Sequence, residues 1–340
     1  MSDAATNTSL KVAVLSFAHG HAVGYLRYLA GLPGIEVAAS DPDGETGEPN
    51  RGKALADELG VTYFDGYAEA LAWAPDAVIV ASENTRHREL VELAAAAGAA
   101  ILCEKPLATT KTDADAMVAA TNKANVTLMV AYPVRFAPSF AALRERVQRG
   151  ELGDILSIVG TNNGKIPLDR GWFTDPALSG GGSIVDHVVH CADLIDALIP
   201  QRALSVHAVS NRILHADRVS QVETGGIASV SYEDGIVATI DCSWSQPESA
   251  ASWGGLTLEV TGTKGSMRIA PFASHIGGYN SAGAAWIPYG ADLDGAMIDE
   301  FLASVKDGRQ AQPDGDAGRR TAAIMAAALE SARVGGVIRV

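Results

Sequence analysis

Five short apolar runs, separated by longer segments of helical periodicity, limit what the first half of this chain can fold into. The runs occupy residues 11–16, 35–40, 76–81, 99–104 and 126–131. Each is rich in Val, Ile, Leu or Ala, which is typical of parallel strands buried on both faces. The segments between them have helical spacing, and most end near a Gly or Asn that can cap a helix: residues 21–32, 51–60, 85–98 and 111–124. The pattern predicts a parallel α/β domain over residues 1–130, with residues 1–9 as a loose polar tail.

After residue 130 the pattern changes. A helical stretch at 139–150 and a strand at 155–163 precede a long loop with Gly and Trp, and a helix follows at 186–198. Strands then recur at hairpin spacing, with YEDG and TGTKG as tight turns. We predict a second, α+β domain over residues 131–340, with a large, mostly antiparallel sheet closed by helices near 291–307 and 317–333.

Charge and cysteine content exclude several classes of function. The formal net charge of −14 would repel a nucleic-acid backbone or an anionic membrane surface. Cys103, Cys191 and Cys242 are widely spaced and odd in number, so we expect no disulfide framework and a reducing cytoplasm. The chain has no apolar run long enough for a membrane span and no secretory signal at its start. We therefore predict a cytoplasmic protein with neither nucleic acid nor membrane as a partner.

The turn after the first strand is where a dinucleotide-binding fold places GxGxxG, and most of the glycines are absent. Ser16, Ala18 and His21 take the three glycine places, with Gly20 one step early. The helix N-terminus that follows can still hold an anion, and His19 and His21 add possible donors. The alternative is a plain strand-to-helix turn. The candidate cofactor contacts here are Ser16, Phe17, Ala18, His19, Gly20 and His21.

Asp41 ends the second predicted strand, twenty residues beyond His21. An acid at this place accepts hydrogen bonds from the adenosine ribose hydroxyls and repels a 2′-phosphate, so it favours NAD over NADP. The alternative is a solvent-exposed turn over residues 41–43, and Arg51 lies close enough in sequence to weaken the preference.

Two further stretches carry groups suited to proton transfer. Glu104 and Lys105 leave a buried strand at the carboxyl edge of the predicted sheet, where ligands of open α/β sheets bind. Asp186 and His190 are four residues apart on one helix face, a spacing that suits a general base and the acid that orients it. Either group can instead be structural. We expect His187 to point elsewhere, and we predict no metal site, because no HExxH motif or nearby third ligand accompanies this pair.

Together these stretches resemble the Gfo/Idh/MocA family of NAD(P)-dependent sugar and cyclitol oxidoreductases, over most of the chain. The resemblance lies in the order ASENTRHRELVELAAAAGAAILCEKPLA, AYPVRFAPSF, GTNNGKIP and GGGSIVDHVVHCADLI. It implies a Rossmann-type dinucleotide-binding domain, a second domain for substrate binding and oligomerisation, and the catalytic set Lys105, Asp186 and His190. It also implies that a nicotinamide site is lined by Ser82, Asn84, His87, Glu104 and Lys105. Glu83 and the missing glycines depart from the family pattern.

The resemblance implies hydride transfer between NAD, or less favourably NADP, and a hydroxyl carbon of a sugar, sugar derivative or cyclitol. His190, held by Asp186, would take the hydroxyl proton while Lys105 shares the relay. Loop residues that can grip hydroxyls, or simply lie on the surface, are Arg135, Asn162, Asn163, Lys165, Arg170 and Trp172, with Trp286 and Tyr289 as a possible cap. We expect a homodimer or homotetramer. A nucleotide-sensing binding protein and an NAD-retaining glycosidase or lyase remain alternatives.

Overall fold

The first half of the chain forms a parallel sheet of six strands in the order β3-β2-β1-β4-β5-β6. The computed structural model describes residues 9–44, 50–281 and 283–340, so most of the predicted tail lies outside the described residues. The strands are β1 Leu10–Leu15, β2 Ile35–Ser40, β3 Thr62–Tyr63, β4 Ala77–Val80, β5 Ala100–Cys103 and β6 Leu128–Val130. The five predicted strands are confirmed. Sequence analysis missed β3, which has two residues and no apolar run to signal it.

Helices cover both faces of this sheet. They are α1 His21–Ala30, α2 Gly52–Leu59, α3 Tyr67–Ala72, α4 His87–Ala96 and α5 Lys111–Ala124. Along β1, Val12 and Val14 pack with α1, while Ala13 and Leu15 pack with α4 on the other face. Because both faces are buried, the strands are apolar throughout rather than alternating. The strand order reverses between β1 and β4, which is where such sheets bind ligands.

The second half forms a seven-stranded sheet in the order β12-β11-β7-β10-β9-β8-β15. Its strands are β7 Ile155–Lys165, β8 Ala203–Asn211, β9 Gly225–Tyr232, β10 Val237–Gln246, β11 Gly254–Gly262, β12 Gly265–Ile269 and β15 Ile338–Arg339. The β7–β10 pair is parallel and the other pairs are antiparallel. The predicted Rossmann-type sheet followed by a mostly antiparallel sheet is thus confirmed.

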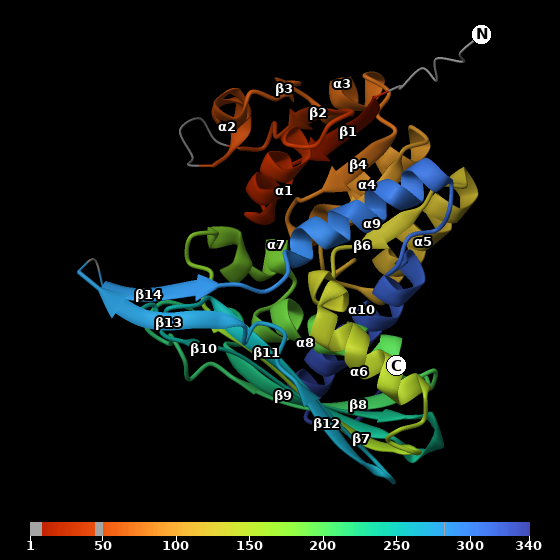
Figure 1. The fold of residues 1–340 in the computed structure, drawn as a ribbon, viewed down its shortest axis with the longest axis vertical. Helices are drawn as coiled ribbons and strands as arrows, with labels where there is room; N and C mark the ends of the chain where they lie inside the picture. Colours follow the sequence, from red (N-terminus) through yellow and green to blue (C-terminus); the bar gives the residue numbers. More distant parts are fainter. Residues whose placement is uncertain (1–8, 45–49, 282) are drawn as a thin grey trace.

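Three helices, α6 Pro138–Gln148, α8 Ser183–Leu198 and α10 Gly315–Val334, lie on one face of the second sheet, between it and the first (Figure 1). The other face is not covered by any described helix. Alternate residues of its strands, Val159 and Val209 among them, are about half exposed there, at 49% and 57%.

The chain after β12 differs from the irregular stretch that the sequence suggested. It forms a hairpin of β13 His275–Asn280 and β14 Gly283–Pro288 beside the second sheet (Figure 1). Tyr289 is 67% exposed, and the side chain of Trp286 lies outside the described residues. The helix α9 Leu293–Asp307 then returns to the first sheet, where Met297 and Phe301 are fully buried beside α1. Within the described parts of the chain, no helix is long and apolar enough to cross a membrane.

Candidate active site

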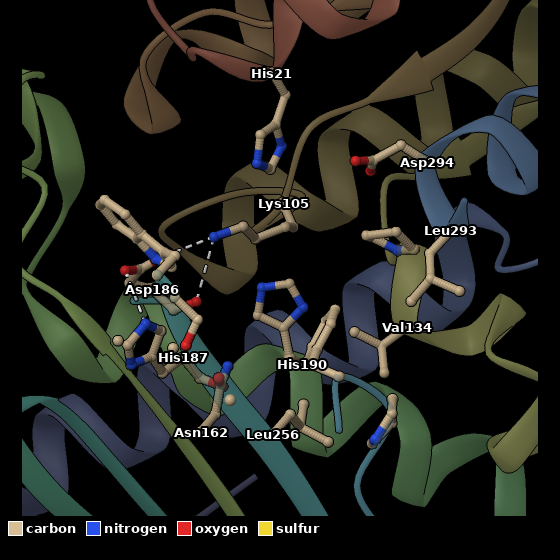
Figure 2. Close-up of a pocket in the computed structure, with 18 of the residues that line it drawn as sticks. His21, Lys105, Val134, Asn162, Asp186, His187, His190, Leu256, Leu293 and Asp294 are labelled. Carbon is tan, nitrogen blue, oxygen red and sulfur yellow. Dashed lines mark hydrogen bonds and ion pairs between the residues drawn. The ribbon is translucent and has the colours of Figure 1, made fainter. Parts of the chain in front are cut away.

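A cavity of about 690 Å³ opens where the carboxyl edge of the first sheet meets the second sheet. Its walls combine His21 and Lys105 from the first half of the chain with Asn162, Asp186 and His190 from the second. Figure 2 shows Lys105 and His190 pointing into the same space, with His21 on the far side of Lys105. Residues that are far apart in sequence therefore meet at the strand edge where such folds bind ligands.

Lys105 and Asp186 form a buried ion pair across the two halves of the chain. Lys105 follows β5 and Asp186 lies in the first turn of α8, and their Nζ and Oδ1 atoms are 2.7 Å apart. Both residues are less than a tenth exposed. Burial alone would raise the pKa of Asp186, but the charge of Lys105, the imidazole of His187 and their hydrogen bonds hold it well below its usual range.

The glycines before α8 place its first turn against the second sheet. Gly180 has a φ of +80°, a left-handed conformation that favours glycine. A Cβ on Gly182 would lie only 1.9 Å from the main-chain oxygen of Glu223, so a larger residue would push α8 away. The run GGG is thus a packing requirement of the helix that carries Asp186 and His190.

The second oxygen of Asp186 does not reach His190, contrary to the sequence prediction. It accepts a hydrogen bond from the indole Nε1 of Trp244 at 3.0 Å and lies 3.2 Å from Nε2 of His187. Asp186 therefore positions Lys105 rather than His190. The expectation that His187 points elsewhere is also wrong, because this side chain lines the cavity.

His190 faces the cavity one helical turn beyond Asp186 and packs against the ring edge of Tyr132. Its Nδ1 is buried and has no hydrogen-bond partner among the described residues. Burial and, to a lesser degree, the charge of Lys105 lower its pKa well below the usual value. The imidazole is therefore neutral at pH 7 and has a free lone pair for a proton.

The turn after β1 is closed over by a loop of the second half. Residues Ser16 to His19 are at most 4% exposed, and Ser16 has the positive φ, 67°, of the glycine it replaces. The indole Nε1 of Trp172 donates to the main-chain oxygen of Ala18 at 2.9 Å. Arg170 lies so close to the N-terminus of α1 that a Cβ on Gly20 would be 3.2 Å from its Nε.

This arrangement fits an anion. The Nε of Arg170 is buried and makes no hydrogen bond within the described part of the chain, although the exposed carboxylate of Asp169 lies 3.5 Å from it. A guanidinium and a helix N-terminus converge there, and both favour negative charge such as that of a phosphate. Arg170, a residue from a distant loop, thus supplies positive charge at the turn from which the glycines are missing.

Asp41 lies at the end of β2, as predicted, but its carboxylate is occupied by the chain itself. Arg51 donates to both oxygens, at 2.7 and 2.9 Å, and the main-chain N–H groups of Phe17 and Gly52 donate as well. Asp41 is 1% exposed as a result. A ribose hydroxyl can bond to this carboxylate only by sharing it with Arg51 or displacing Arg51.

Glu104 is fully buried between β5 and α1. One oxygen accepts from the hydroxyl of Tyr25 at 2.7 Å and lies 2.9 Å from Nδ1 of His21, and the other accepts from the main-chain N–H of Lys105. Burial would raise the pKa of Glu104, but the neighbouring His19 and His21 hold it well below its usual range. Glu104 is therefore ionised beside two imidazoles.

Comparison with known proteins places this arrangement in a family. Residues 45–132 match the family model described as an oxidoreductase family with an NAD-binding Rossmann fold, and residues 140–268 match the GFO/IDH/MocA C-terminal domain. The chain belongs to the Gfo/Idh/MocA family. The resemblance is confirmed, and so is the prediction of NAD as the cofactor that the first domain is built to bind.

Two relatives of this Gfo/Idh/MocA chain are named for a sugar or a sugar derivative. It is 31% identical over 222 residues to 1,5-anhydro-D-fructose reductase of Ensifer adhaerens, 64% of either chain. It is 28% identical over 326 residues to D-apiose dehydrogenase of Paraburkholderia graminis, 90% of this chain and 84% of the other. The match to the reductase thus spans slightly less than two thirds of that relative.

Solved structures share the whole fold. The TM-score is 0.86 with GenD2 from gentamicin A biosynthesis in complex with NAD, at 24% identity over 98% of this chain and 96% of that one. It is 0.83 with myo-inositol 2-dehydrogenase from Lactobacillus plantarum, at 23% identity over 98% and 99%. At these identities the likeness shows the fold alone.

The remaining predicted cofactor contacts in this Gfo/Idh/MocA chain are buried behind the cavity. The two ring nitrogens of His87 lie 2.8 and 3.2 Å from the main-chain oxygens of Pro106 and Ser82, and the neutral ring donates to one of them. Asn84 donates to the oxygen of Ser179, and Ser82 donates to that of Glu83. Ser82, Asn84 and His87 do not line the cavity. His87 thus connects the segment after β4 to the turn that carries Lys105, and Asn84 connects it to Ser179.

Three of the six predicted substrate contacts line the cavity: Asn162, Asn163 and Arg170. The other three do not. Arg135 pairs with Asp193 at 2.6 Å, Lys165 donates to the main-chain oxygens of Glu248 and Ala250, and Trp172 is buried on Ala18. Sequence reasoning overlooked His187, Trp253 and Asp294, which also line the cavity. Of these three residues, only His187 could have been found from the sequence, because it directly follows Asp186.

Proposed function

We propose that this protein is an NAD-dependent oxidoreductase that transfers a hydride between nicotinamide and a hydroxyl-bearing carbon of a sugar, sugar derivative or cyclitol. The observation that carries the proposal is the convergence, in one cavity, of an ammonium fixed by Asp186 and a neutral imidazole, Lys105 and His190. The names of two relatives, 1,5-anhydro-D-fructose reductase and D-apiose dehydrogenase, support the substrate class.

The dinucleotide would be held by groups that lie along the carboxyl edge of the first sheet. Arg170 and the N-terminus of α1 suit its phosphates, and Asp41 lies where the adenosine ribose is bound in folds of this kind. Glu104 and Lys105 would flank the nicotinamide half. When bound, the nicotinamide accepts or donates the hydride.

The residues of the chain manage the proton. His190 lines the cavity as a neutral imidazole and accepts the hydroxyl proton as the carbon is oxidised. The ammonium of Lys105, fixed at 2.7 Å from Asp186, donates a hydrogen bond to the same oxygen and so keeps it in place. In the reverse direction protonated His190 returns the proton to the carbonyl oxygen.

The cavity wall opposite Lys105 suits a polyhydroxylated ring. Asn162, Asn163 and His187 offer donors and acceptors, and Trp253 and Phe272 offer aromatic faces. Hydroxyl groups need such paired donors and acceptors, while the carbon face of a sugar ring packs on an aromatic side chain.

Calorimetric titration of the purified protein with NAD and with NADP tests the first step. We expect micromolar binding of NAD and weaker binding of NADP, followed by NADH formation with at least one sugar or cyclitol in a substrate screen. Absence of binding by either dinucleotide would contradict the proposal. NAD binding with no turnover would favour the alternative of a nucleotide-sensing binding protein. Product formation without net release of NADH would favour the alternative of an NAD-retaining glycosidase or lyase.

We also propose a homo-oligomer, a homodimer or homotetramer, that works in the cytoplasm. The outer face of the second sheet exposes Val159, Val209 and Ile227, and a second copy of the same sheet is a self-complementary partner for it. The three cysteines are free and buried, in keeping with a reducing compartment.

A further inference from the structure

His19, His21 and Glu104 bring three metal-ligating side chains together at one end of the cavity. One ligand atom from each lies within 4.8 Å of the other two. The two histidines come from the turn into α1, and Glu104 comes from the end of β5, 83 residues further along the chain than His21. Nothing in the proposed hydride transfer requires two imidazoles beside this carboxylate.

The distances between these atoms are those of a nearly preformed site. With bonds of about 2.1 Å, two ligand atoms on a tetrahedral zinc ion lie about 3.4 Å apart. The Oε1 atom of Glu104 is 2.9 Å from Nδ1 of His21 and 3.7 Å from Nδ1 of His19. Both distances are within about half an ångström of that value, and the two histidine nitrogens lie within 4.8 Å of each other, so side-chain movement would complete the geometry.

The imidazole of His19 is buried and only weakly hydrogen-bonded. The imidazole is 1% exposed, and its Nε2 has no hydrogen-bond partner among the described residues. Its Nδ1, which faces Glu104, receives only a long 3.4 Å approach from the main-chain N–H of His21. A metal ion bound at Nδ1 would replace this weak contact with a strong one, while Nε2 would still need a partner of its own.

Neighbouring groups hold the Glu104 carboxylate in place, as hydrogen-bond partners of metal ligands commonly do. Tyr25 donates to the same Glu104 oxygen that faces the histidines, and the main-chain N–H of Lys105 holds the other oxygen.

We propose that His19, His21 and Glu104 form a binding site for a zinc-like divalent transition metal ion. Two imidazoles and one carboxylate are a ligand set of catalytic zinc sites, which keep a fourth position open. His19 and His21 both line the cavity, so the fourth position faces the space next to Lys105 and is open to water or to an oxygen of a bound molecule. Mg²⁺ and Ca²⁺ prefer oxygen ligands, so two imidazole nitrogens select against them.

The test is a titration of the chelator-treated, desalted full chain with Zn²⁺, read by competition with a chromogenic chelator. We expect one ion bound per chain, no binding of Mg²⁺ under the same conditions, and the visible absorption of a tetrahedral Co²⁺ ion when Co²⁺ replaces Zn²⁺. His21→Ala and Glu104→Gln should each weaken Zn²⁺ binding by at least about tenfold.

His207→Ala is the matched control, because this histidine is exposed on β8, away from the cavity. It should bind Zn²⁺ as tightly as the natural sequence does. His21 is partly exposed, so His21→Ala should keep the fold, and circular dichroism checks this even if Glu104→Gln fails to fold. Binding that is equally tight in His21→Ala, or equally weakened in His207→Ala, would overturn the proposal.

Discussion

The buried pair of Lys105 and Asp186 makes a quantitative prediction about stability. Asp186→Asn removes the charge that faces Lys105 and keeps nearly the same side-chain volume. The ammonium then has only uncharged acceptors, the new side-chain amide oxygen and the main-chain oxygen of residue 186 at 3.4 Å, within a site that is about 5% exposed. Removing one partner of a buried ion pair costs about 3–5 kcal/mol, because the other charge stays buried without compensation.

The two partners should differ in their cost. In Lys105→Met, the carboxylate of Asp186 keeps the indole of Trp244 at 3.0 Å and His187 at 3.2 Å. We therefore expect a loss near the lower limit, about 3 kcal/mol, for Lys105→Met and near the upper limit, about 5 kcal/mol, for Asp186→Asn. The double variant leaves no unpaired charge, and its loss should be smaller than the two single losses together by about 3 kcal/mol.

Equilibrium unfolding in guanidinium chloride at pH 7, followed by circular dichroism, measures these free energies. Asp57→Asn is the control, since it breaks an exposed pair with Lys53 and should change the unfolding free energy by about 1 kcal/mol or less. The reasoning is refuted if Lys105→Met costs more than Asp186→Asn, or if the two single losses simply add in the double variant.

Four further predictions follow from the site and the surface. His190→Ala should lower kcat by about 10²–10⁴-fold, while its unfolding midpoint stays close to that of the control variant His207→Ala. A near-normal rate would show that His190 takes no part in the proton transfer. Burial lowers the pKa of His19, His87 and His190, so the folded chain keeps them neutral while the unfolded chain takes up protons below about pH 6.5. The unfolding free energy should therefore fall as the pH drops below about 6.5, by up to about 1.4 kcal/mol per pH unit for each histidine, and unfolding curves that do not change over this range would contradict it. Asp41→Ala should weaken the binding of NAD by about tenfold and the binding of NADP by less, whereas Arg51→Ala should increase the preference for NAD. If titration calorimetry finds the ratio of the NAD and NADP affinities unchanged in both variants, the assigned ribose contact is excluded. Val159→Asp should reduce the mass measured by light scattering relative to Leu93→Asp, an exposed position on α4, and equal masses would show that the sheet face is not the interface.

Local patterns were enough to predict most of the fold. Apolar runs such as residues 35–40 coincide with a strand, and the segment 111–124 coincides with α5, which Thr110 caps at its N-terminus. These features depend on neighbours in the sequence, where side-chain periodicity and capping act. The hairpin of β13 and β14 was missed because five of its twelve strand residues are Gly or Ala and the strands lack the alternation of a half-buried strand.

The candidate site was predicted in part. Lys105, Asp186 and His190 do line one cavity, but the partner of Asp186 is Lys105 and not His190. Helical spacing correctly put Asp186 and His190 near each other, yet it cannot tell which neighbour a carboxylate selects. That choice depends on Lys105, Trp244 and His187, which three different elements bring to it.

The sequence by itself determined the order of strands and helices, the family and the residue types available for proton transfer, because periodicity and motif spacing are local properties of the chain. Only the tertiary structure decided what those residues contact. It closed Trp172 over Ala18, covered Asp41 with Arg51 and placed Glu104 beside His19 and His21. Such contacts join positions tens of residues apart, and their geometry depends on how whole elements pack, which no local pattern records.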